Sequence, residues 1–215
     1  MIEYTPNPDK LFFTSDIHFG HKVVIDKLKR PFTDVADMDR SISTKWNAIV
    51  PKDADVYILG DVSFHKLIQT VDLLSQLNGR LHLVWGNHDR KLMKKREFNC
   101  CFDEVTFDRI IDLRVEETRI VLCHFPLESW ENMSHGAWHL HGHSHGNMRP
   151  HAMEDPEGVD ERRRAVSLEP LAERLARAKP QPLPADRERF EHDYQEWLIA
   201  VGWRTRPQSS RKEPA

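Results

Sequence analysis

The chain has 215 residues, of which 30% are charged, and a formal net charge of −3. This length permits one full-sized domain with its own hydrophobic core, and the near balance of charge gives no overall field that would recruit nucleic acid or a membrane surface. Three cysteines, two of them adjacent, do not make a disulfide framework. The N-terminus has neither the basic nor the apolar region of a secretory signal, and no apolar run is long enough to span a bilayer. We therefore expect a cytoplasmic protein.

Three short apolar runs in the first half are typical of buried parallel strands. They span residues 11–15, 56–59 and 81–85, and each is followed directly by Asp or Gly. Helical patterns at residues 37–50 and 64–78 separate them. The apolar residues that share a helix face are Met38, Ile42, Trp46 and Ile49 in the first and Leu67, Val71 and Leu74 in the second. Strand–helix–strand succession predicts right-handed crossovers and a largely parallel sheet.

After residue 106, the predicted pattern changes from strands alternating with helices to strands that follow one another. Residues 107–115 and 118–124 predict a hairpin that turns at Glu116-Glu117, and a further strand leads into residue 139. Strands that follow one another without long helices indicate a second sheet packed on the first.

The C-terminal part is predicted mostly as connecting and helical segments. Residues 147–165 are polar and predict a loop, and Ser167 is a candidate cap for a short helix to about residue 177. We expect a domain over residues 1–178, a helical extension packed on it over residues 179–205, and a disordered tail over residues 206–215.

The run His-Leu-His-Gly-His-Ser-His-Gly at residues 139–146 departs furthest from ordinary composition. Imidazole is the commonest transition-metal ligand in proteins, so the run is a candidate metal site. A His-rich surface loop is the alternative. The run is internal, follows the apolar segment 136–138 and is punctuated by Gly142 and Gly146, which favours a structured turn.

Other ligand-type side chains follow the predicted strands. They occur in Asp16-Ile17-His18, Gly60-Asp61, Gly86-Asn87-His88-Asp89, Cys123-His124 and Gly142-His143-Ser144-His145. Asp16 and His18 occupy alternate positions, so in an extended segment their side chains would face the same way. Each motif alone is weak. Because ligands bind beyond the carboxyl ends of strands in α/β sheets, the five together indicate one metal centre.

In this order, the five motifs resemble those of the calcineurin-like metallophosphoesterases. Residues 13–22, 30–32, 57–61 and 140–146 are similar to a small bacterial and phage branch of predicted phosphoesterases, and the similarity covers about residues 10–170. The resemblance implies an α/β fold, a four-layer αββα sandwich of two mixed β-sheets flanked by helices.

The resemblance also implies two divalent metal ions. One would be held by Asp16, His18 and His145, the other by Asn87, His124 and His143, with the Asp61 carboxylate bridging both. Mixed nitrogen and oxygen ligands suit Mn, Fe, Zn, Ni or Co better than Mg or Ca, and Mn is our first expectation.

The family histidine that is not a ligand matches His88. It would donate a proton to the leaving alkoxide or stabilise charge on the phosphoryl group. Asp89 would orient His88, with a plain helix N-cap as the alternative. His21 and Arg30 are candidates to lie near the substrate, although a packing role is equally open for His21. We expect His82 and Cys123 to be structural.

The function that follows is hydrolysis of phosphoric esters by in-line attack of a hydroxide that bridges two metals. A phosphodiesterase or phosphatase acting on a small nucleotide-like substrate is the first expectation, and neither a membrane nor long nucleic acid is an expected partner. A nuclease or phosphoprotein phosphatase would use the same site. A non-catalytic metal-binding scaffold belongs to another class and is disfavoured because every motif position is filled.

Overall fold

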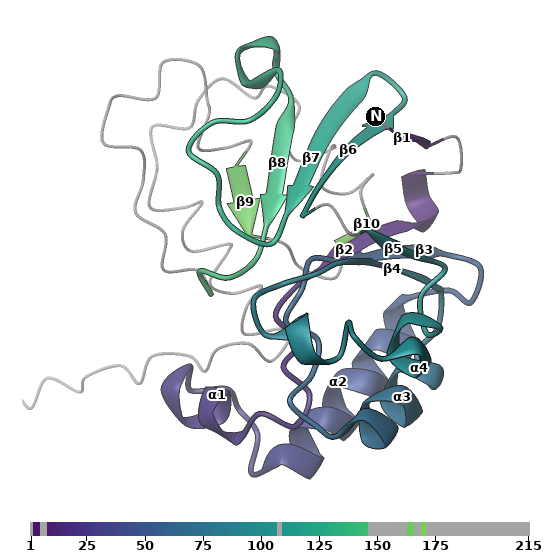
Figure 1. Cartoon of the computed structure of the whole chain (residues 1–215), viewed down its shortest axis with the longest axis vertical. Coiled ribbons are helices and arrows are strands. Elements are labelled where there is room, and N and C mark those ends of the chain that lie inside the picture. Colours follow the sequence, from purple (N-terminus) through teal and green to yellow (C-terminus); the bar gives the residue numbers. More distant parts are fainter. Residues whose placement is uncertain (1, 5–7, 107–108, 146–162, 166–168, 171–215) are drawn as a thin grey trace, which may run out of the picture.

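The protein is seen here in a computed structural model that describes residues 2–4, 8–106, 109–145, 163–165 and 169–170. Two five-stranded sheets lie face to face, and a layer of helices covers the outer face of one of them (Figure 1). The expected α/β sandwich of two mixed sheets with helices is confirmed.

The first sheet has the strand order β10-β2-β3-β4-β5. Its strands are β2 (Leu11–Thr14), β3 (Asp55–Ile58), β4 (Arg80–Val84), β5 (Glu104–Thr106) and β10 (Glu169–Pro170). The strands β2 to β5 are parallel, and β10 runs antiparallel to β2. The three apolar runs predicted as strands are therefore β2, β3 and β4, with ends that differ by one residue.

The second sheet has the order β1-β6-β7-β8-β9. Its strands are β1 (Ile2–Tyr4), β6 (Ile110–Val115), β7 (Thr118–Cys123), β8 (Trp138–His141) and β9 (Arg163–Ala165). The expected hairpin is the antiparallel pair β6–β7, in which Val115 pairs with Thr118 across the two glutamates. The other three pairings are parallel.

The helices are α1 (Lys22–Lys27), α2 (Val35–Ile49), α3 (Leu67–Ser75) and α4 (Arg96–Asn99), with short 3-10 turns η1 (Pro8–Lys10), η2 (Asp89–Lys91) and η3 (Met133–His135). The Asp34 side chain caps α2 by accepting a hydrogen bond from the Asp37 N–H. Of the apolar face predicted for this helix, Met38 and Trp46 are buried, but Ile49 is exposed at the last turn. No helix within the described residues is long and apolar enough to cross a membrane.

Because successive side chains on a strand point to opposite faces, the first sheet contributes to two hydrophobic cores. On β2, Leu11 and Phe13 face the second sheet and pack against residues such as Leu113 and Leu140. Phe12, between them, faces the helices in a core that includes Trp46. Because β2, β3 and β4 are largely buried on both faces, these strands consist mostly of apolar residues, and the ligand-type side chains follow where the strands end.

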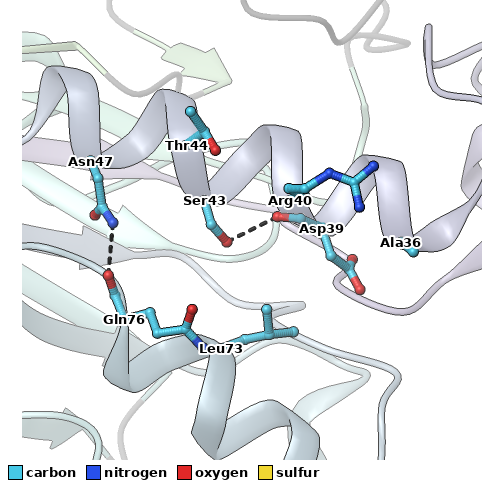
Figure 2. A pocket seen from close by; sticks show the side chains of 8 residues that line it. All are labelled: Ala36, Asp39, Arg40, Ser43, Thr44, Asn47, Leu73 and Gln76. Atoms are coloured by element: carbon cyan, nitrogen blue, oxygen red, sulfur yellow. Dashed lines mark hydrogen bonds between the residues drawn. The ribbon is translucent and has the colours of Figure 1, made fainter.

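The helices α2 and α3 are joined by polar contacts around a hollow on the helical side of the molecule (Figure 2). The Asn47 side chain donates a 2.7 Å hydrogen bond to the Gln76 carbonyl and accepts one of the same length from the Asn78 N–H. The hollow contains none of the candidate metal ligands.

Two expectations are corrected where the structure describes them: Arg163–Ala165, predicted within a loop, form β9, and Glu169–Pro170, predicted within a short helix, form β10, because each segment adds a strand to the edge of a sheet. The rest of the helix predicted to about residue 177, the helical extension over residues 179–205 and the tail over residues 206–215 lie outside the described residues.

Candidate metal centre

The loops that follow β2, β3, β4, β7 and β8 meet at one end of the two sheets. Backbone hydrogen bonds tie neighbouring loops together: the Asp16 N–H donates to the Gly60 carbonyl at 3.0 Å, and the Gly142 N–H donates to the His124 carbonyl at 3.0 Å. The expected convergence of the motifs at the strand ends is thus present in the structure.

Five candidate ligands adopt a left-handed backbone conformation that non-glycine residues rarely use. Their φ angles are 52° for Asp16, 58° for His18, 57° for Asp61, 64° for His143 and 48° for His145. Residues held in this region cost roughly 1–3 kcal/mol each and cluster at functional sites.

The left-handed conformations correct one expectation. The strand β2 ends at Thr14 and β8 ends at His141, so the Asp-x-His and His-x-His pairs lie in turns beyond the strands. Their side chains converge through the turns and not through alternation on an extended strand.

Glycines allow these loops to approach closely. A Cβ on Gly86 would lie 2.4 Å from Asp61 Oδ1, and one on Gly142 would lie 1.7 Å from Ser15 Oγ and 2.3 Å from Asp16 Oδ2. Side chains larger than hydrogen would therefore push the carboxylates out of place.

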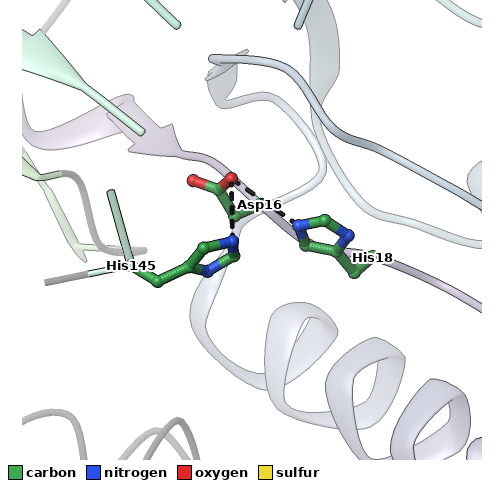
Figure 3. A group of neighbouring side chains, drawn as sticks. All are labelled: Asp16, His18 and His145. Atoms are coloured by element: carbon green, nitrogen blue, oxygen red, sulfur yellow. Dashed lines mark ion pairs between the residues drawn. The ribbon is translucent and has the colours of Figure 1, made fainter. Parts of the chain in front are cut away.

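The first group of ligands comprises Asp16, His18 and His145 (Figure 3). Both imidazole Nε2 atoms lie 3.7 Å from Asp16 Oδ1. The other carboxylate oxygen of Asp16, Oδ2, accepts hydrogen bonds from Ser15 Oγ at 2.6 Å and from the His143 N–H at 2.9 Å. Asp16 Oδ1 and His18 Nε2 are buried without a hydrogen-bond partner, as expected for atoms whose natural partner is a metal ion.

The ionisation states of this group suit metal binding. Burial would raise the pKa of Asp16, but the imidazoles of His18 and His145 outweigh it and bring that pKa to about 2. Burial lowers the pKa of His145 to about 4. A carboxylate and a neutral imidazole are the forms that coordinate metal.

His21 contacts His18 at the Nδ1 atom of its ring. Their Nδ1 atoms lie 3.1 Å apart, so one must donate and the other accept. With His18 Nε2 turned toward the carboxylates as an acceptor, the proton of His18 belongs on Nδ1 and His21 accepts it. Burial, followed by the effect of His18, lowers the pKa of His21 to about 4, which keeps His21 a neutral acceptor. Phe64 stacks on the His21 ring with centroids 3.6 Å apart.

The second group comprises Asn87, His124 and His143. The Nδ1 atom of His124 lies 2.7 Å from the Leu59 carbonyl and must donate to it, so Nε2 is the nitrogen that a neutral ring would offer to a metal ion. That Nε2 lies 2.9 Å from Asn87 Oδ1, and His143 Nδ1 lies 3.0 Å from the same oxygen. Three electron-pair donors thus converge.

Asp61 lies between the two groups. Its Oδ2 is 3.8 Å from His18 Nε2 of the first group and 3.6 Å from His124 Nε2 of the second. Atoms that bind one ion at about 2.0–2.3 Å lie roughly 3–4 Å from one another. The donors therefore fit two divalent cations that share this carboxylate.

His88 lies at the edge of the site with its side chain 46% exposed and its Nε2 3.9 Å from Asp61 Oδ2. Its backbone N–H donates to Asp61 Oδ1 at 3.0 Å. The imidazole is thus beside the shared carboxylate and accessible from outside, which suits a group that exchanges a proton with a substrate.

Asp89 has a different role from the expected one. It is fully buried, and its carboxylate accepts hydrogen bonds from the N–H groups of Asp61, Val62 and Gly86 at 2.7–2.9 Å instead of holding the His88 ring. Burial raises the pKa of Asp89, and the three N–H donors oppose this effect. Asp89 therefore positions two ligand-bearing loops.

Arg30 also differs from expectation. It is 4% exposed, and its guanidinium donates to the Ile17 carbonyl at 2.9 Å and to the Asp16 carbonyl at 2.8 Å. It supports the backbone of the first ligand loop from inside the protein, so it does not face a substrate.

The remaining histidines of the His-rich run hold the fold. His139 Nδ1 donates to the Val121 carbonyl and its Nε2 accepts from the Leu127 N–H, both at 3.0 Å, so both nitrogens are used. His141 is buried with Nδ1 2.9 Å from the Gly142 carbonyl. His82 pairs with Asp55 at 2.9 Å and Cys123 is buried, as expected for structural residues.

Sequence reasoning missed Ser15, Phe64 and the Leu59 carbonyl. Ser15 adjoins Asp16, and Phe64 lies three positions after Asp61, but neither residue type signals a metal site. A main-chain carbonyl carries no sequence signal at all, since every residue has one.

Comparisons with known proteins agree with this geometry. The family model described as "Calcineurin-like phosphoesterase" matches residues 10–214. "Uncharacterized protein MJ1445" of Methanocaldococcus jannaschii is 31% identical over 140 residues, which are 64% of this chain and 70% of that protein. "Gene 66 protein" of Mycobacterium phage D29 is 31% identical over 178 residues, with 69% of this chain and 85% of that protein covered.

Among solved structures, a protein of unknown function, AQ665 from Aquifex aeolicus, matches with a TM-score of 0.51 and 23% identity over 73% of this chain and 88% of that chain. It shows a shared fold. The match of the family model to nearly the whole chain shows more: this protein belongs to the calcineurin-like phosphoesterase family.

Proposed function

We propose that this protein is a two-metal phosphodiesterase or phosphatase that acts on small nucleotide-like phosphoesters in the cytoplasm. Metal-dependent hydrolysis of phosphoesters is the activity of its family. The observation that carries the two-metal proposal is the position of Asp61 Oδ2, which faces His18 and His124 at 3.8 and 3.6 Å. One carboxylate oxygen between two sets of imidazoles favours two cations that share it.

Two divalent ions at this place would lower the pKa of a water molecule and stabilise charge on the phosphoryl oxygens. The ligand set of three carboxylate or amide side chains and four imidazoles supports Mn first, with Fe, Zn, Ni or Co as other ions that such ligands accept. The chain itself contributes rigidity: Asp89 and Arg30 hold the ligand loops, and His21 fixes the ring of His18.

His88 completes the proposed site. Its ring is exposed and has no part in either ligand group, so it is available to protonate a leaving alkoxide or to donate a hydrogen bond to the phosphoryl group. Phe64, whose ring centroid lies 4.8 Å from that of His88, limits the directions in which the imidazole can turn.

The proposal is tested by turnover with Mn²⁺ of bis-p-nitrophenyl phosphate, p-nitrophenyl phosphate and 2′,3′-cyclic nucleotides. We expect the wild type to hydrolyse at least one of them. We expect Asp61→Asn to lose activity together with metal, and His88→Ala to lose about 10²–10⁴ of kcat while it keeps metal. His88→Ala retains the backbone N–H that donates to Asp61, so it removes the imidazole alone.

His135→Ala, at an exposed histidine whose ring contacts Ser134, is the matched control and should keep full activity. A wild type that binds two metal ions but turns over none of these substrates would favour the non-catalytic scaffold instead.

A further inference from the structure

Arg109 lies beside the candidate metal centre with its guanidinium against aromatic rings. Its Cζ is 4.0 Å from the centroid of the Trp85 ring and 5.9 Å from that of Phe125. A guanidinium over an aromatic face is attracted by the ring quadrupole and keeps its N–H edge available. The guanidinium thus packs on the Trp85 ring, with the Phe125 ring on a second side.

Both rings adjoin the second group of ligands. Trp85 directly precedes Gly86-Asn87, and Phe125 directly follows His124. The Phe125 ring centroid lies 4.7 Å from that of His143. Arg109 itself precedes Ile110, the residue that pairs with Cys123 just before His124. The Arg109 guanidinium therefore lies at the end of the site formed by Asn87, His124 and His143. Phe64 and His21 border the other end, which contains His18.

The Arg109 side chain is half-buried, and within the described residues its guanidinium has neither a carboxylate at ion-pair distance nor a hydrogen-bond acceptor. Other arginines are engaged: Arg30 donates to two carbonyls, and Arg119 pairs with Asp112. A guanidinium presents paired N–H donors that match two oxygens of a phosphate, and such charge-assisted pairs are the stronger hydrogen bonds. A guanidinium that packs on aromatic rings, has no acceptor within the described residues and lies next to a phosphoester site is matched chemically by an anion that arrives with the substrate.

We propose that Arg109 binds a second phosphate of the substrate, separate from the phosphoester that is cleaved. The inference rests on the proposed function and narrows its substrate class to nucleotides that carry at least two phosphate groups. The scissile phosphate lies over the two ligand groups, and the second one lies beyond Phe125, at Arg109. Arg109 is then a specificity-determining residue and takes no part in the chemical step.

Inhibition of bis-p-nitrophenyl phosphate hydrolysis tests the proposal. The inhibitors are thymidine 3′,5′-bisphosphate, thymidine 5′-monophosphate and thymidine 3′-monophosphate, so that either phosphate of the bisphosphate can occupy the metal centre. We expect the wild type to bind the bisphosphate about 10- to 100-fold more tightly than either monophosphate, as a charged hydrogen-bonded pair allows.

Arg109→Met keeps a long side chain over the rings but removes the charge, and it should abolish this preference while the inhibition constants of the monophosphates stay the same. Arg109→Lys should retain part of the preference. The matched control is Arg114→Met, at the other end of β6, which should behave as wild type.

Equal binding of bisphosphate and monophosphates by the wild type would overturn the proposal. So would a preference that survives in Arg109→Met, or an equal loss of affinity for all three inhibitors, which would assign Arg109 to the cleaved phosphate. Repeating the measurement with the dinucleotide pTpT, in which one of the two phosphates is a phosphodiester, distinguishes two substrate classes: Arg109-dependent inhibition shows that a strand with an internal phosphodiester is accepted, and its absence shows that both phosphates must be terminal.

Failure of the proposed function is seen separately. If the wild type does not hydrolyse bis-p-nitrophenyl phosphate, calorimetric binding of the same three nucleotides to the Mn²⁺-loaded protein still tests Arg109.

Discussion

The buried carboxylate of Asp89 accepts a 2.8 Å hydrogen bond from the backbone N–H of Asp61, whose own carboxylate lies between the two ligand groups. Asp61 in turn accepts from the backbone N–H of His88, next to Asp89 in the chain. The loops after β3 and β4 are thus locked together by two carboxylates, each of which holds the backbone of the other loop. The bridging position of Asp61 depends on this pair.

The first prediction concerns Asp89→Asn. Asp89 Oδ2 accepts from the N–H groups of both Asp61 and Gly86, and Oδ1 accepts from that of Val62. An amide has one oxygen, so at least one buried N–H loses its acceptor, at a cost of about 1–3 kcal/mol in unfolding free energy. Because the loop that carries Asp61 loosens, we expect metal affinity to fall about 10- to 100-fold. Urea unfolding and calorimetric Mn²⁺ titration measure the two effects, with Asp103→Asn at an exposed site as control. Wild-type metal affinity in Asp89→Asn would contradict the positioning role.

The second prediction concerns Gly142→Ala. The added methyl group would lie 1.7 Å from Ser15 Oγ and 2.3 Å from Asp16 Oδ2, so the loop after β8 must move away from Asp16. We expect loss of the metal ion held by the first ligand group, measured as bound metal per protein by elemental analysis. Gly136→Ala is the control because Gly136 has a φ of +85° but open space around it. It should lose about 1–2 kcal/mol of stability and keep its metal. Full metal content in Gly142→Ala would show that the loops are looser than the structure indicates.

The third prediction concerns His21. Its Nδ1 accepts from His18 Nδ1 at 3.1 Å, and His21→Ala removes that acceptor. We expect affinity for the first metal to fall about 10-fold, since outer partners orient ligating imidazoles. Phe64→Leu removes the aromatic stack on His21 but leaves its acceptor, so metal affinity should stay near wild type. A larger loss of metal affinity in Phe64→Leu than in His21→Ala, measured by Mn²⁺ titration, would show that stacking and not the hydrogen bond orients His18.

The fourth prediction concerns removal of metal. Without cations, the buried acceptors Asp16 Oδ1 and His18 Nε2 face each other and Asp61 with no positive charge between them. We expect a chelator to lower the melting temperature and added Mn²⁺ to restore it, with about 2.7 kcal/mol of stabilisation at a free concentration 100 times the Kd. Asp61→Asn should lose most of this response. A melting temperature that is indifferent to both chelator and Mn²⁺ would argue against the metal centre.

Much of the site was predictable because its polar residues end apolar strands. The runs that became β2, β3 and β4 are largely buried on both faces, so their ends are visible as the Asp or Gly that directly follows each apolar run. The role of Asp89 was not predictable. Its three hydrogen-bond donors are main-chain groups of Asp61, Val62 and Gly86, two of which lie more than 25 residues away in the chain, and main-chain N–H groups are the same at every position.

The sequence by itself determined the two-sheet α/β class and the set of candidate ligands, because periodicity and residue type are local properties. Only the tertiary structure decided which nitrogen of each histidine is available. His124 and His139 each donate through Nδ1 to a carbonyl, but a backbone N–H also occupies Nε2 of His139, whereas Nε2 of His124 faces Asp61. Histidine is thus a candidate metal ligand at position 124 and a structural, hydrogen-bonded residue at position 139. The difference lies in which groups from distant strands complete its surroundings.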